Sequence, residues 1–117
     1  MEYMLLIYGR EADLRAMSEQ DGGILFREYS SFTQGIVQSG NFKGGAPLQP
    51  TAMATTVRVR NGKPVSTDGP FAETREQLGG YYIVEARDLD EAVAIAARIP
   101  DARNGSIEVR PVRKIDM

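Results

Sequence analysis

The chain of 117 residues contains no cysteine and no histidine. Without cysteine it can form no disulfide, use no thiolate nucleophile and hold no metal through sulfur, which fits a reducing cytosol. Without histidine it lacks the side chain that most often serves as a general base near neutral pH and as a metal ligand. Any chemistry must therefore come from Asp, Glu, Tyr, Lys, Arg or Ser, or from a bound cofactor.

Long apolar runs and an excess of basic charge are missing too. No stretch approaches the roughly 18 apolar residues that cross a membrane, and residues 1–8 are too short and too acidic for a signal peptide. The net charge is −2 with the two signs interspersed, which argues against a nucleic-acid partner. We expect a cytoplasmic protein that contacts neither membrane nor nucleic acid.

Motifs for cofactors and metals are equally scarce. The pairs Gly44-Gly45 and Gly79-Gly80 lack the spacing of phosphate-binding loops. The Asp and Glu residues do not follow the spacing of a calcium-binding loop. The sequence thus predicts no cofactor and no metal.

The length and an ordinary composition, 42% hydrophobic and 26% charged, predict one globular domain over residues 1–117. Tyr3–Tyr8 is a nearly continuous apolar run, which predicts a strand that needs cover on both faces. Residues 54–60 alternate, Asn61-Gly62 is a favoured hairpin turn, and 63–67 would return. Further strands are expected at 80–86 and 106–112. The glycines and prolines of residues 44–50 predict a loop.

Two segments have helical periodicity. Residues 24–39 carry one stripe, and residues 88–91 form a capping-box pattern that begins a second helix. The stripes are Leu25, Tyr29, Phe32 and Ile36 in the first, and Leu89, Val93, Ala96 and Ile99 in the second. A short helix at 11–17 would end before the break at Asp21-Gly22-Gly23.

This order of elements predicts an α+β fold, the ferredoxin-like βαββαβ sandwich, with both helices on one face of an antiparallel sheet. The other face of the sheet would be bare in a monomer. Because the first strand is apolar on both sides, a second copy packing sheet to sheet is the simplest cover. We therefore expect a homodimer.

The densest motif lies at residues 67–82, where Thr67-Asp68-Gly69-Pro70-Phe71-Ala72-Glu73-Thr74 is followed by Gly79-Gly80-Tyr81-Tyr82. Other recognisable pieces are Tyr3–Tyr8, Leu48-Gln49-Pro50, Ala54–Arg58, Glu85–Ala92 and Glu108-Val109-Arg110-Pro111. Over nearly its whole length the chain resembles the DGPF branch of the YCII-related proteins. The combination is specific, although no single piece is.

The resemblance implies a dimeric α+β barrel in which two ferredoxin-like sheets face each other. Relatives in that superfamily include muconolactone-isomerase-like enzymes, antibiotic-biosynthesis monooxygenases and a dehydrochlorinase, so fold transfers better than chemistry. Some relatives occur beside sigma factors, which implies a regulatory role. The wider group is credited with a His–Asp pair. This chain has no histidine, so Asp68 is the acidic candidate that remains.

Asp68 is either a turn carboxylate or a general base at the edge of a cleft. Arg58 could hold a carboxylate, or lie on a solvated strand face together with Arg60. Phe71 and Tyr29 could line a pocket for an apolar ligand, although aromatic residues more often belong to the core. Tyr81 and Tyr82 should point to opposite sheet faces, and we take Tyr82 as the candidate acid.

Two functions remain open. In the first, Asp68 abstracts a proton from a small organic acid while a tyrosine acts as acid and an arginine binds the carboxylate, giving isomerisation or elimination. In the second, the protein is a non-catalytic ligand-sensing or protein-interaction module linked to transcriptional regulation, which the missing histidine favours.

Overall fold

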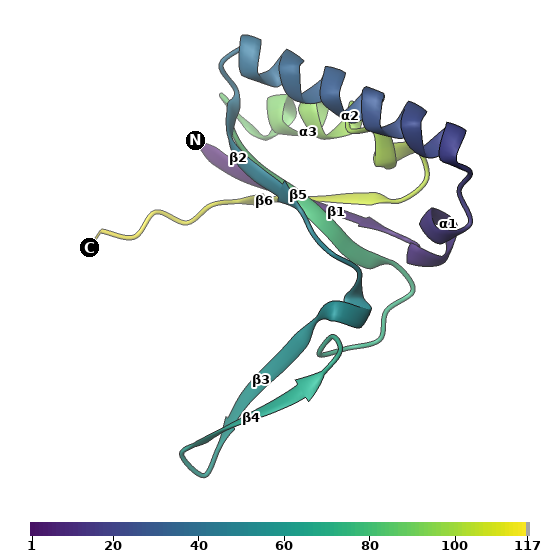
Figure 1. Ribbon diagram of the computed structural model, residues 1–117. Helices are drawn as coiled ribbons and strands as arrows, with labels where there is room; N and C mark the ends of the chain where they lie inside the picture. Colours follow the sequence, from purple (N-terminus) through teal and green to yellow (C-terminus); the bar gives the residue numbers. More distant parts are fainter. Residues whose placement is uncertain (117) are drawn as a thin grey trace.

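The computed structural model describes residues 1–116 (Figure 1). Four strands form one antiparallel sheet in the order β2-β5-β1-β6, and β3 and β4 form a separate hairpin. The elements are β1 (Glu2–Gly9), α1 (Glu11–Arg15), α2 (Glu19–Gln38), β2 (Phe42–Pro47), η1 (Thr51–Met53), β3 (Thr55–Arg60), β4 (Lys63–Asp68), β5 (Gln77–Glu85), α3 (Leu89–Ala97), η2 (Pro100–Arg103) and β6 (Ser106–Pro111).

The connections β1-α2-β2 and β5-α3-β6 are the two halves of a ferredoxin-like fold. Both helices cover the same face of the sheet (Figure 1). The predicted α+β class and the antiparallel sheet are confirmed. Within residues 1–116 the sheet is open and does not close into a barrel.

The second strand of the sheet corrects the sequence prediction. Residues 44–50 were expected to be a loop, but Phe42–Pro47 is the edge strand β2. Gly45 has φ +156°, and a Cβ there would lie 2.6 Å from the Tyr81 carbonyl oxygen. Glycine therefore allows the close approach of β2 to β5, and Pro47 is tolerated at the end of an edge strand.

The helix boundaries also differ from the prediction. Helix α1 ends at Arg15, and α2 begins at Glu19, so Gly22 and Gly23 lie inside a helix and do not separate two. The Ser18 side chain accepts a hydrogen bond from the Asp21 N–H (3.1 Å) and caps α2. Asp88 caps α3 through the Glu91 N–H (2.9 Å), as the capping-box pattern predicted.

The core lies between the helices and one face of the sheet. The first predicted stripe is confirmed at Phe32 and Ile36, which are buried, with Tyr29 packed against them. The second predicted stripe is confirmed at Ala96 and Ile99, which are buried, and is wrong at Leu89 and Val93, which are exposed. In place of those two, α3 buries Ala92 and Ile95. Small alanines let α3 lie close to the sheet.

The opposite face of the sheet has no cover within the described chain. Tyr3, Leu5 and Ile7 are buried beneath the helices, whereas Met4, Leu6 and Tyr8 alternate with them and are partly exposed. By register, the residues on this second face are Met4, Leu6, Tyr81, Ile83, Glu108 and Arg110, and we call them the open face. The first strand was expected to need cover on both sides, and only one side is covered within the described chain.

The hairpin of β3 and β4, Thr55–Asp68, extends away from the sheet, and we call it the arm (Figure 1). Its turn is the predicted one, with Asn61 at φ 52° and Gly62 at φ 75°. The arm was expected to be part of the main sheet but forms its own two-stranded sheet. The radius of gyration is 16.3 Å, against about 13 Å for a compact chain of this length.

Candidate functional site

Asp68 lies at the root of the arm, as the last residue of β4 opposite Thr55. The turn behind it is fixed by two hydrogen bonds: Gly69 N–H donates to the Ala54 carbonyl (2.7 Å), and the Thr56 hydroxyl donates to the Gly69 carbonyl (2.8 Å). Gly69 has φ +99°, which favours glycine. The Asp68 carboxylate is exposed, and none of the hydrogen bonds among residues 1–116 involves it. The turn thus presents this carboxylate to solvent.

Arg58 and Phe71 belong to the same region, but Arg58 does not face Asp68. Arg58 pairs with Val65, and in a two-stranded ribbon this places it on the face opposite to the Thr55–Asp68 pair. Phe71 is 80% exposed, so it is not a core residue. Within one chain, Asp68 therefore has no arginine of the arm on its own side.

Tyr82 and Tyr29 lie elsewhere, between the sheet and α2. The Tyr82 hydroxyl is 2.7 Å from the Thr33 hydroxyl, and its ring meets Phe32 edge to face at 5.2 Å. The Tyr29 hydroxyl donates to the Asp101 carboxylate (2.5 Å). Burial, and then this hydrogen bond, raise the pKa of Tyr29 well above its usual range. Both hydroxyls are already engaged in contacts within the core.

The five candidate residues thus form two separate groups. Asp68, Arg58 and Phe71 belong to the arm and its root, whereas Tyr82 and Tyr29 belong to the helix side of the sheet. Tyr81 and Tyr82 do point to opposite faces, as predicted, and Tyr81 is the one on the open face. A tyrosine that meets Asp68 across the open face would be Tyr81.

Glu11 fixes the root of the arm to the body and was not identified from the sequence. Its carboxylate accepts hydrogen bonds from the Thr51 N–H (2.7 Å) and hydroxyl (2.6 Å), just before β3. The Thr51 hydroxyl, then the Thr51 N–H, lower the pKa of Glu11. Its own N–H donates to the Gln77 side chain (2.9 Å). No local spacing could have revealed contacts that span 40 and 66 residues.

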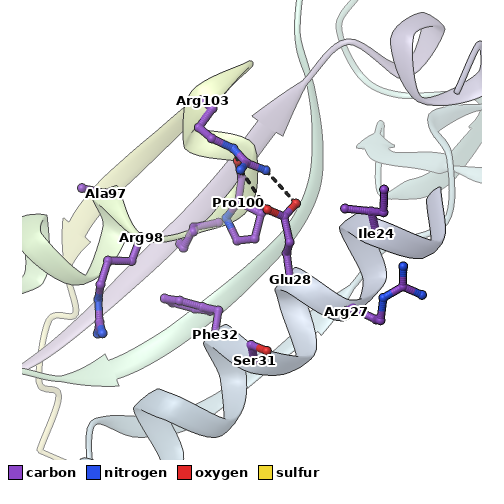
Figure 2. Close-up of a pocket in the computed structure, with 10 residues that line it drawn as sticks. Ile24, Arg27, Glu28, Ser31, Phe32, Ala97, Arg98, Pro100 and Arg103 are labelled. Carbon is purple, nitrogen blue, oxygen red and sulfur yellow. Dashed lines mark hydrogen bonds and ion pairs between the residues drawn. The ribbon is translucent and has the colours of Figure 1, made fainter. Parts of the chain in front are cut away.

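A groove of about 570 Å³ runs between α2 and the segment of α3 and η2 (Figure 2). Arg103 forms two hydrogen bonds with the Glu28 carboxylate there, at 2.8 and 2.9 Å. This pairing lowers the pKa of Glu28 and raises that of Arg103. Arg98 lies over the Phe32 ring at 5.9 Å. The groove is on the helical side, remote from the open face, and none of the five candidates lines it.

Within residues 1–116 no three acidic side chains gather closely enough to hold a metal ion. No helix in that range combines the length and the apolar character needed to cross a bilayer.

Comparison with known proteins identifies the family of the chain. The model of the YCII-related domain matches residues 1–116. The chain belongs to the YCII-related family. This YCII-related protein is also similar to an uncharacterised protein of Rhizobium meliloti (strain 1021), with 38% identity over 114 residues that cover 96% of the chain and 92% of the relative. The resemblance predicted from the sequence is confirmed at the level of the YCII-related family.

Proposed function

We propose that this YCII-related protein works as a homodimer whose two open faces meet and enclose a cleft for a small organic acid. The observation that carries the proposal is the pairing of apolar side chains at the centre of the open face. Met4 lies beside Ile83, and Leu6 lies beside Tyr81, on the two central strands. Such a face on a sheet otherwise covered by helices favours a second layer.

Sheet-to-sheet packing by a two-fold axis satisfies this need with the same surface on both subunits. Packed sheets lie about 10 Å apart, which excludes water from the centre of the face. Each apolar side chain removed from water stabilises the assembly by about 1.5–3 kcal/mol when fully buried. The four central side chains of each subunit are partly exposed in the single chain, so covering them favours association.

The polar groups around that face suit a carboxylate-bearing ligand. Arg110 lies beside Met4 on the open face and is exposed. A guanidinium can bind a carboxylate through two parallel hydrogen bonds. The arginine that holds the ligand is thus Arg110 in this proposal, since Arg58 lies on the far face of the arm.

Asp68 supplies the base, at the rim of the cleft. Its carboxylate takes a proton from the carbon next to the ligand's carbonyl group, and the hydroxyl of Tyr81 donates to the oxygen on which charge develops. Return of the proton to another carbon gives isomerisation, and loss of a leaving group gives elimination. The free carboxylate of Asp68 and the half-exposed Tyr81 support these roles better than the engaged hydroxyl of Tyr82.

The test is exchange of carbon-bound protons in D₂O, followed by NMR for a panel of small aliphatic and aromatic keto acids. We expect Asp68→Asn to lower the exchange rate at least 100-fold, because general bases contribute about 10²–10⁴-fold. Asp90→Asn, an equally exposed aspartate on α3, is the control and should exchange at the wild-type rate. Equal rates in the wild type and Asp68→Asn, with both folded, would remove Asp68 from the mechanism.

A second candidate is a non-catalytic module that senses a ligand or binds a protein partner. It is favoured by the absence of histidine and by the exposure of Asp68, which does not line the groove between α2 and η2. The same panel separates the two functions. Binding seen by line broadening without exchange, and unchanged in Asp68→Asn, identifies the module.

A further inference from the structure

We propose that the arm acts between subunits: its valine-bearing face packs on the partner, so that each cleft is completed by Asp68 and Phe71 of one chain and the open face of the other. The inference rests on the proposed homodimer and adds which segment reaches across it. It makes the site composite, with no complete copy in a single chain.

The direction of the arm is the first argument. The helices cover one face of the sheet, and the arm extends on the other side, toward which the open face looks (Figure 1). A second copy seated on the open face would therefore lie next to the arm. By two-fold symmetry, its own arm would lie next to the first subunit.

The length of the arm decides where it must end. A strand of six residues spans about 20 Å, whereas two packed sheets lie about 10 Å apart. An arm about twice as long as this separation cannot end in the space between the subunits. It therefore has to run along the partner's surface.

The root of the arm is fixed, so its direction is set by the fold. Glu11 binds the Thr51 N–H and hydroxyl, and Gly69 N–H binds the Ala54 carbonyl. The Glu11 bonds fix the segment before β3 to α1. The Gly69 bond joins the end of β4 to the start of β3. Because these bonds already order the arm in the monomer, less conformational entropy is lost when the arm binds.

The two faces of the arm differ in character. One face carries Val57, Val59 and Pro64, and the two valines are 61% and 63% exposed. The other face carries Arg58, Arg60 and Lys63 beside Val65. An isolated two-stranded ribbon is marginal in water, so an apolar face of this kind requires a surface to pack on. Phe71, near the root, adds a further exposed ring.

Net charge favours a second copy of this chain as the occupant. The arm has three basic residues and one acidic residue, whereas the whole chain has a net charge of −2, so the rest of the chain carries −4. An arm of charge +2 is attracted to a body of charge −4 over distances longer than one contact, although its three basic side chains lie on the face opposite the valines. A nucleic acid would also attract the basic face but would leave the valine face exposed.

Photo-crosslinking tests the contact without assuming a register. Val59 is replaced by p-benzoylphenylalanine, and the variant is mixed with ¹⁵N-labelled wild-type chain. We expect crosslinked peptides that join the unlabelled arm to labelled strands of the main sheet, at residues 2–9, 77–85 or 106–111. The control carries the same group at Phe26, which is 73% exposed on α2 and should give no crosslink to a labelled chain.

The dimer dissociation constant, from sedimentation, gives a second readout. Val57→Ser with Val59→Ser should raise it at least tenfold and leave the thermal midpoint of the diluted monomer unchanged. The matched control replaces the exposed valines of the helices, Val37→Ser with Val93→Ser, and should leave the constant unchanged. The inference about the arm is overturned, and the dimer is not, if the wild type is a dimer that gives no crosslink from the arm and the two serine substitutions leave its dissociation constant unchanged. A wild-type monomer at millimolar concentration would overturn the dimer and the arm together.

Discussion

Tyr29 and Asp101 join α2 to η2 through a hydrogen bond of 2.5 Å, and this contact assigns Tyr29 a structural role. Replacing Tyr29 by Phe removes the donor and leaves the carboxylate without it, at an expected cost of about 1–3 kcal/mol in the free energy of unfolding. Urea unfolding at pH 7 measures this loss. If Tyr29 instead contacted a ligand, Tyr29→Phe would change binding and leave stability at the wild-type value.

The same contact has a pH dependence with a definite sign. Because the folded state raises the pKa of Tyr29, its contribution is fully present below about pH 10, the unfolded value, and decreases as the pH rises above it. The wild type should therefore lose more stability than Tyr29→Phe between pH 9 and pH 11. The other tyrosines ionise in both proteins, so the difference between them reports Tyr29 alone.

At the scale of the element, β2 shows what glycine does in an edge strand. Gly45→Ala places a Cβ 2.6 Å from the Tyr81 carbonyl oxygen and should cost about 1–3 kcal/mol or more in stability. Gly44→Ala is the matched control, because a Cβ at Gly44 meets nothing within 4 Å. Thermal unfolding of the two variants measures the difference. Equal midpoints would contradict the close approach of β2 to β5.

The strand β2 also shows which part of the fold could not be predicted from the sequence. The hairpin turn, the Asp88 cap of α3 and the stripe on α2 were predictable, because each depends on residues a few positions apart. Gly44-Gly45 favours a loop by local preference, and only the tertiary approach of Tyr81 turns it into a strand. The first half of the stripe on α3 was misplaced for a similar reason. A stripe through Leu89 and Val93 is more apolar, but the sheet meets the alanines.

The candidate site was predictable to a smaller extent than the fold. The motif located Asp68 at a turn, and the alternation of Tyr81 and Tyr82 was correct. That Arg58 and Asp68 lie on opposite faces depends on the register of β3 and β4, which the turn alone could have supplied. The Glu11–Thr51 contact and the separation of the arm from the sheet depend on long-range packing, for which the sequence contains no local signal.

At the scale of the whole molecule, the proposed homodimer makes a prediction about the open face. Leu6 lies at the centre of the open face beside Tyr81, so Leu6→Glu would bury a carboxylate between the two sheets and should convert the dimer to monomer. Phe26→Glu changes an exposed residue of α2 by the same chemistry and should leave the dimer intact. Sedimentation velocity separates the two outcomes.

The monomer produced by Leu6→Glu then shows which position the arm takes when no partner is present. If the bonds at Glu11 and Gly69 hold the arm outward without a partner, small-angle scattering should give a radius of gyration near 16 Å. An arm that folded back onto the vacated open face would bring the value toward about 13 Å. The extended value means that the subunit presents a preformed arm to its partner. The compact value means that the arm covers its own sheet until a second copy displaces it.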